Sequence, residues 1–169
     1  MVAEELLSRW ELGRPRDRFR GRIAEGRLPS GFAAAAGDRP PRVAVLCPQT
    51  YMNDSGRSVG PARGALKVAL EHVVAVHDEI DLPFGEIRAR LGGGLAGHNG
   101  LKSLKRELGS ADFIRVRVGV GRPDSTDPEI VSAHVLGRFS ESPVEVAELV
   151  GRACEEVERI VLGEELPSR

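Results

Sequence analysis

The apolar residues of this chain gather in short runs and alternating stretches that predict several β-strands. Two apolar runs, Arg42–Cys47 and Val73–Val76, have the composition of strands buried on both faces. Basic and apolar side chains alternate from Glu86 to Leu91, and a cleaner alternation spans Phe113 to Gly121. The period of two in the last stretch predicts a strand with its two arginines on one face.

Helical spacing of apolar residues predicts helices at Val2–Trp10, 55–70, 100–108 and 142–163. The last of these opens with Ser142-Pro143 and has Glu145 three residues after the serine, which is the pattern of a capping box. Strands that alternate with helices predict a single α/β domain over residues 1–163, with a partly parallel sheet covered by helices. Residues 164–169 are predicted to be a disordered tail.

Cations alternate with other residues after the first helix. Arg16, Arg18, Arg20 and Arg22 recur at every second position, which predicts a strand with one solvated face. Such charge keeps an exposed edge strand soluble, and it also suits a strip that faces RNA, so both interpretations stay open. Residues 28–41 predict a loose hairpin with a weak strand at alanines 33–36.

Composition restricts the class of protein further. With 169 residues, 41% hydrophobic and 29% charged, the chain suits one globular domain. Its formal net charge of −1 means that any nucleic-acid contact is a local patch. Cys47 and Cys154 lack metal-type spacing and are interpreted as core residues of a protein from a reducing cytoplasm. No apolar run approaches the roughly 20 residues of a membrane span.

Polar side chains stand where α/β proteins bind ligands. Asp78 follows the second apolar run, and ligands bind beyond the carboxyl ends of such strands. Its carboxylate suits the orientation of a histidine or a water, with helix capping or pairing with an arginine as the alternative. Asn53 and Asn99 stand at the starts of two predicted helices, where an amide can hold a substrate group or simply cap the helix. Glu79 and Asp81 are interpreted as solvated or turn-forming.

A glycine-rich segment lies between these features. Gly92-Gly93-Gly94 and Gly97 precede a helix start, which can hold a phosphate on backbone N–H groups, but the Gly-Lys-Ser/Thr ending of a P-loop is absent. The nearby cations, which suit phosphate contacts or ordinary solvated faces, are Arg88, Arg90, Lys102, Lys105, Arg106, Arg115 and Arg117. Aromatic residues make up only 4% of the chain, so a base-stacking surface is not expected.

Four segments resemble the bacterial peptidyl-tRNA hydrolase family in order and spacing. Pro48–Gly56 is similar to the family's PxTxMNxSG segment, and His77–Gly85 to its HDELDLPxG segment. Gly92–Lys102 resembles the glycine loop with GHNGLK, and Arg115–Gly121 resembles the RxRxGIG strand. The resemblance extends over residues 1–162. It implies a mixed twisted sheet and a monomeric cytoplasmic enzyme without metal or cofactor.

The resemblance also implies an activity and its residues. The family hydrolyses the ester between a peptide and the terminal ribose of tRNA. By position, Asp78 resembles the carboxylate that orients the catalytic histidine. Asn53 resembles the amide that holds substrate and histidine, and Asn99 the amide that positions water and peptide backbone.

The same resemblance implies where tRNA binds. Tyr51 resembles the aromatic residue that borders the tRNA 3′ end. Arg90 and Arg117 resemble the pair that clamps a tRNA phosphate on the acceptor side, and Arg88 and Lys102 are further candidates for that surface. The partner implied is peptidyl-tRNA, without a membrane.

The sequence departs from the family at its beginning. The family opens with a central strand, an asparagine loop and a TRHNxG segment whose histidine is the general base, whereas Val2–Trp10 resembles the family's first helix. We therefore expect the first central strand and the base to be missing here, and an upstream extension to supply them.

None of the four histidines, His72, His77, His98 and His134, is expected to substitute for the missing base. Loss of a general base typically costs roughly 10²–10⁴ in rate, so we expect residues 1–169 to be nearly inactive as a hydrolase. The alternative is a non-catalytic RNA-binding module, because the family includes relatives that act as chloroplast splicing factors.

Overall fold

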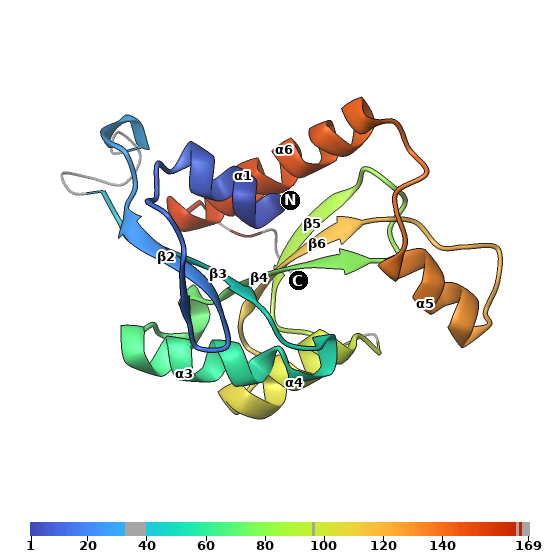
Figure 1. Ribbon diagram of the computed structural model, residues 1–169, viewed down its shortest axis with the longest axis horizontal. Coiled ribbons are helices and arrows are strands. Elements are labelled where there is room, and N and C mark those ends of the chain that lie inside the picture. The colour runs from blue at the N-terminus through green and yellow to red at the C-terminus, as the bar shows by residue number, and fades with distance from the viewer. Residues whose placement is uncertain (33–39, 96, 165, 167–169) are drawn as a thin grey trace.

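Two three-stranded sheets form the centre of the molecule, with helices on both sides of them (Figure 1). The computed structural model describes residues 1–32, 40–95, 97–164 and 166. The predicted alanine strand at 33–36 and most of the predicted tail lie outside the described residues. The prediction of an α/β fold with a mixed sheet is confirmed.

The first sheet consists of β1 (Arg16–Arg18), β2 (Gly21–Arg27) and β3 (Arg42–Pro48), and all of its pairs are antiparallel. The single strand predicted across the alternating arginines is therefore wrong. The chain turns at Phe19 and Arg20, and both residues have positive φ, at 56° and 52°. Neither Phe nor Arg is a usual residue for such a turn, so no local pattern predicted this hairpin.

The second sheet has the order β4-β6-β5, with bounds Val74–Glu79 for β4, Ile114–Gly119 for β6 and Ile87–Leu91 for β5. β4 runs parallel to the central β6, and β5 runs antiparallel to it. The alternation in β6 sends Val116 and Val118 to one face, where they are buried, and its arginines to the other.

Helices cover the two faces of the sheets as separate layers. On one side lie α1 (Val2–Arg9) and α6 (Pro143–Val161), and on the other lie α3 (Gly56–Leu66) and α4 (Asn99–Leu108) (Figure 1). The capping box predicted at Ser142 and Glu145 is present. Short 3-10 turns occupy Ser30–Phe32 (η1), Met52–Asp54 (η2) and Leu70–His72 (η3).

One further helix, α5 (Pro128–Leu136), was not predicted, because its apolar residues have no helical stripe and none of them is buried. Its start was readable in the sequence, since Asp127 caps the helix and Pro128 takes the first helical position. The predicted helix at 55–70 is shorter than expected, because it ends at Lys67, whose φ is 54°.

Two strands are less buried than their composition predicts. Only Val45 is buried in β3, and β4 is half-buried from Val74 to Asp78. Among the described residues each of these strands has a pairing partner on one side only, so each is an edge strand. Cys47 on β3 is exposed, which makes its assignment to the core wrong, whereas Cys154 is fully buried as predicted.

Candidate functional site

Strand register brings the polar residues of the second sheet to one face. Across the sheet His77 lies opposite Arg117, and Arg117 lies opposite Arg88. One step along, Arg115 lies opposite Arg90. A cavity of about 340 Å³ opens on this face, lined by His77, Glu79, Arg90, Gly94, Leu101, Arg115 and Arg117. Within it three guanidinium groups meet one carboxylate, so the cavity favours an anion.

Glu79 supplies that carboxylate and is the main correction to the predicted site. It is only 6% exposed, and its Oε2 accepts a hydrogen bond from Nε of Arg117 at 3.0 Å. Its Oε1 accepts from the backbone N–H of Asp81 at 3.2 Å. The prediction that Glu79 is solvated is wrong, because the parallel pairing of β4 with β6 places its side chain beside Arg117.

Arg115 has a structural task that the sequence did not indicate. Its side chain is 2% exposed and donates hydrogen bonds to the carbonyl oxygens of Gly93 (2.9 Å) and Gly94. A third, longer bond reaches the carbonyl of Ala111. Burial, and then the charges of its two neighbouring arginines, lower the pKa of the Arg115 guanidinium. Arg115 therefore supports the glycine loop through these hydrogen bonds, at the wall of the cavity that it also lines.

Arg90 lies directly against the glycine loop. Its Nε donates to the carbonyl of Gly92 at 3.1 Å. A Cβ built on Gly93 would stand 1.3 Å from the Arg90 guanidinium, and the φ of Gly93 is 98°. Glycine is required there on both counts. Of the two further candidates, Arg88 is exposed and paired with Glu86, and Lys102 is exposed on α4.

Asp78 and His98 meet at the carboxyl end of β4. Oδ1 of Asp78 lies 3.4 Å from Nε2 of His98. Burial by itself raises the pKa of the Asp78 carboxyl, but the hydrogen bond and charge of His98 outweigh it and leave this pKa below its ordinary value. Nδ1 of His98 accepts a hydrogen bond from the N–H of Leu101, which makes His98 the N-cap of α4. Both ring nitrogens are therefore engaged.

His77 lies beside this pair. Its Nδ1 donates to the carbonyl oxygen of Asp78 at 2.7 Å, so the neutral ring has its lone pair on Nε2. Nε2 is buried and has no hydrogen-bond partner among the described residues. Burial lowers the pKa of His77, which keeps the ring neutral. The ring packs edge-on against His98, with 4.8 Å between the centroids.

The two asparagines are exposed residues of segments that pack against each other, η2 and the start of α4, and we call these two segments the rim. Asn53 is exposed in η2, and Asn99 is exposed as the first residue of α4. η2 packs against α4, since a Cβ on Gly100 would stand 2.7 Å from Sδ of Met52. The alternative that these amides serve as N-caps is wrong, because no side chain caps α3 and His98 caps α4. Tyr51, the N-cap of η2, is 85% exposed and is counted with the rim.

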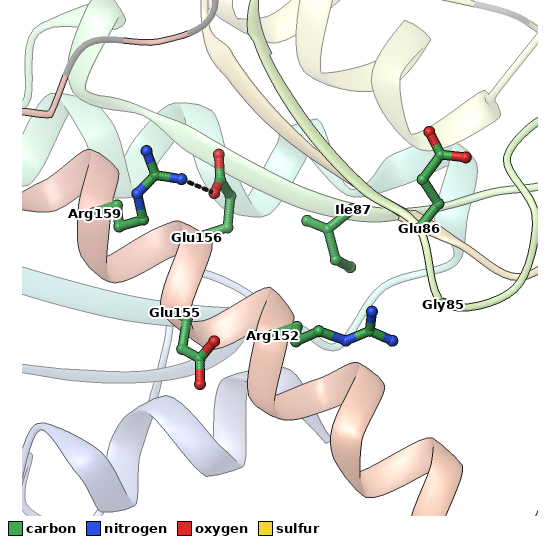
Figure 2. Close-up of a pocket in the computed structure, with 7 residues that line it drawn as sticks. All are labelled: Gly85, Glu86, Ile87, Arg152, Glu155, Glu156 and Arg159. Atoms are coloured by element: carbon green, nitrogen blue, oxygen red, sulfur yellow. Dashed lines mark hydrogen bonds and ion pairs between the residues drawn. The ribbon is translucent and has the colours of Figure 1, made fainter.

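A second cavity, of about 380 Å³, lies between β5 and α6 and contains none of the predicted site residues (Figure 2). It is lined by Gly85, Glu86, Ile87, Arg152, Glu155, Glu156 and Arg159. Two of these, Glu156 and Arg159, pair with each other at 3.0 Å.

Among the described helices, α1 to α6, each is too short or too polar to cross a bilayer.

Comparisons with known proteins identify the family. The family model described as "Peptidyl-tRNA hydrolase" matches residues 1–168. The fold and this match together define the class of the protein, which is a hydrolase with an α/β fold. The chain belongs to the peptidyl-tRNA hydrolase family.

Individual relatives cover nearly the whole chain. It is 44% identical over 167 residues to a peptidyl-tRNA hydrolase of Kineococcus radiotolerans, a match that covers 96% of this chain and 80% of the relative. The corresponding protein of Azorhizobium caulinodans is 38% identical, with 96% and 74% covered. The crystal structure of peptidyl-tRNA hydrolase from Acinetobacter baumannii superposes with a TM-score of 0.79 at 32% identity and covers 96% of this chain and 78% of its own.

Proposed function

We propose that the site at the carboxyl end of β4 hydrolyses the ester bond of peptidyl-tRNA and releases peptide and free tRNA. The observation that supports this proposal is the contact of Asp78 with His98, the residue before Asn99, on a sheet whose cavity is lined by three arginines. Asn53 is added to the site because its segment, η2, packs against the helix that starts at Asn99. An RNA-binding module without catalysis has no need for all three of Asp78, Asn53 and Asn99. The enzyme is proposed to act as a cytoplasmic monomer.

In the proposed reaction the oxygen of a water molecule attacks the ester carbonyl carbon. The C–O bond to the ribose breaks, the water gives up a proton, and the departing ribose oxygen takes one. Asn53 and Asn99 present amides at the rim, where they can hold the carbonyl and the water. Asp78 is ionised at neutral pH because its pKa is lowered, so it can orient and stabilise a histidine as that histidine becomes charged.

The proton acceptor needs a histidine nitrogen with an accessible lone pair. His98 uses both nitrogens, and the free lone pair of His77 is buried. We therefore assign the base to a histidine on a further strand that lies between β3 and β4. Among the residues that the structure describes, β3 and β4 are each paired on one side only, and the other edge of each offers a row of backbone N–H and C=O groups, which supports that placement. Residues 1–169 alone are then impaired as a hydrolase.

tRNA is proposed to bind across the same face. Arg90 and Arg117 hold a phosphate of the acceptor side at the cavity, and Arg88 and Lys102 extend the cationic surface. Tyr51 borders the 3′ end at the rim, next to Asn53.

Release of peptide from labelled peptidyl-tRNA tests the activity, with the 169-residue form compared with a form extended by the sequence encoded upstream of Met1. We expect turnover from the extended form only, and Asp78→Asn in that form to lower kcat by about 10² or more. Asp81→Asn is the matched control, because Asp81 is an exposed carboxylate that pairs with Arg122. Equal turnover from the short form would remove the assignment of an additional histidine. Binding of tRNA without turnover in any form would favour the RNA-binding module.

A further inference from the structure

The β1–β2 hairpin carries four arginines, Arg16, Arg18, Arg20 and Arg22, and all four side chains are exposed. None of them has a carboxylate within ion-pair distance among the residues that the structure describes. Arg16 and Arg18 share one face of β1, Arg20 lies in the turn, and Arg22 lies on the other face opposite Asp17. Residues 16–22 therefore carry four arginines and one aspartate, a local excess of positive charge in a chain of net charge −1. We call these four residues the arginine hairpin.

The turn of the arginine hairpin is held in a conformation that its residues rarely adopt. Arg18 pairs with Gly21, so the loop has two residues, Phe19 and Arg20, and both have positive φ. A two-residue loop of this kind favours Asn-Gly, and it is strained for large side chains. The Phe19 ring lies under the Arg18 guanidinium, 4.3 Å from its centroid to Cζ, and fixes that cation. Charge placed only for solubility would not need a strained turn.

The hairpin turn lies at the same end of the first sheet as the proposed tRNA 3′-end site. Gly21 pairs with Pro48, and the carbonyl of Arg20 accepts a hydrogen bond from the N–H of Gln49 at 2.9 Å. Gln49 stands two residues before Tyr51, so this hydrogen bond connects the turn to the segment that leads into η2. At the opposite end of the same sheet Arg27 pairs with Arg42, and both are exposed.

We infer that the arginine hairpin is a second contact for the phosphate backbone of the tRNA substrate, on the first sheet, complementing the Arg90–Arg117 cavity on the second. This rests on the proposed function. RNA is favoured because guanidinium groups bind phosphate oxygens in pairs and the proposed substrate is a polyanion. An acidic protein surface would be a different occupant.

The test is tRNA binding by the 169-residue chain at several salt concentrations, using deacylated tRNA as the probe. Arg18→Gln with Arg20→Gln should weaken binding about tenfold at low salt and reduce the slope of log K against log salt by roughly 1.5, because each lost phosphate contact removes about 0.7–0.9. Arg27→Gln with Arg42→Gln removes the same charge at the far end of the sheet and should change affinity less than about twofold. Arg18→Lys with Arg20→Lys should restore most of the slope.

Equal losses in the two Gln variants would mean that only the overall field matters, and they would overturn the contact. Unchanged affinity and slope in the Arg18/Arg20 variant would overturn it too, leaving an acidic protein as the occupant to seek. If tRNA binding depends on the hairpin but no form releases peptide, the hydrolase proposal fails and the contact stands. If wild type does not bind tRNA at any salt, the hairpin contact fails, while peptide release by the extended form reports separately on the activity.

Discussion

Glu79 on β4 and Arg117 on β6 form an ion pair, with Nε and Oε2 3.0 Å apart, at the wall of the cationic cavity. The carboxylate fixes one edge of the guanidinium, so the remaining N–H groups of Arg117 keep a constant direction. It also balances one of the three positive charges that line the cavity. Glu79 therefore sets the net charge of the cavity and the orientation of Arg117, the residue proposed to bind a phosphate.

Glu79→Gln should destabilise the fold by roughly 1–3 kcal/mol, because it leaves a partly buried arginine without its carboxylate. The same change should strengthen tRNA binding at low salt and steepen its salt dependence, because one negative charge leaves the cavity. Urea unfolding and a salt titration measure the two effects. Glu86→Gln is the matched control, since Glu86 pairs with the exposed Arg88, and its effect on stability should stay below about 0.5–1 kcal/mol. Similar losses of unfolding free energy in the two variants would show that the buried Glu79–Arg117 pair stabilises the fold no more than the exposed Glu86–Arg88 pair does.

Arg115→Lys should loosen the glycine loop although it keeps the charge. A lysine cannot donate to the carbonyls of Gly93 and Gly94 with the planar geometry of a guanidinium, so we expect a loss of roughly 2 kcal/mol in unfolding free energy. Hydrogen exchange at the backbone of the loop should become faster. Arg106→Lys, on the exposed side of α4, should leave both measurements unchanged. Unaltered exchange in the Arg115 variant would contradict the supporting role.

Gly93→Ala should disturb the proposed phosphate contact of Arg90, and Gly94→Ala should not. A methyl group on Gly93 collides with Arg90 and must accept a φ of 98°, whereas a Cβ on Gly94 meets nothing within 4 Å. The expected cost at Gly93 is about 1–2 kcal/mol, accompanied by a several-fold loss of tRNA affinity as Arg90 is displaced. Thermal unfolding and tRNA titration of both variants measure this. Equal behaviour of the two alanines would show that Arg90 is free to move away.

His77 should make stability depend on pH below neutrality. Burial lowers the pKa of its folded form, so the unfolded chain binds the proton more readily, beginning near the ordinary value of about 6.5. The contribution is complete above that pH and is lost as pH falls toward the folded pKa. His77→Leu should flatten this part of the unfolding profile, and His72→Gln, at an exposed position, should retain the fall. A profile that is the same in wild type and His77→Leu would rule out His77 as the cause.

Sequence periodicity predicted most of the scaffold because the signals were local. The capping box at Ser142 and the apolar stripe that follows it predicted α6, and the predicted end at residue 163 lies two residues beyond the observed end at Val161. Strand β6 followed from alternation alone. The turn at Phe19 and Arg20 escaped prediction because left-handed φ there is imposed by the pairing of β1 with β2, not by glycine or asparagine.

The site was predictable only in part for a related reason. Motifs drew attention to Asp78, Asn53 and Asn99, whose assigned roles remain predictions. The partnership of Glu79 with Arg117 joins residues 38 positions apart and depends on the register of β4 with β6. No local pattern contains that register. The burial of Arg115 likewise depends on the position of the glycine loop, because its guanidinium donates to the carbonyls of Gly93 and Gly94.

The two cysteines differ in exposure, so a thiol reagent should modify only one of them. Burial raises the pKa of Cys154 to about 11, so almost none of its thiolate exists at neutral pH and no reagent reaches it. Cys47 is exposed and lies opposite Arg22 in the first sheet. A maleimide fluorophore should therefore attach at Cys47 alone, without any engineered substitution. Its emission would then report an RNA strand that arrives at the arginine hairpin.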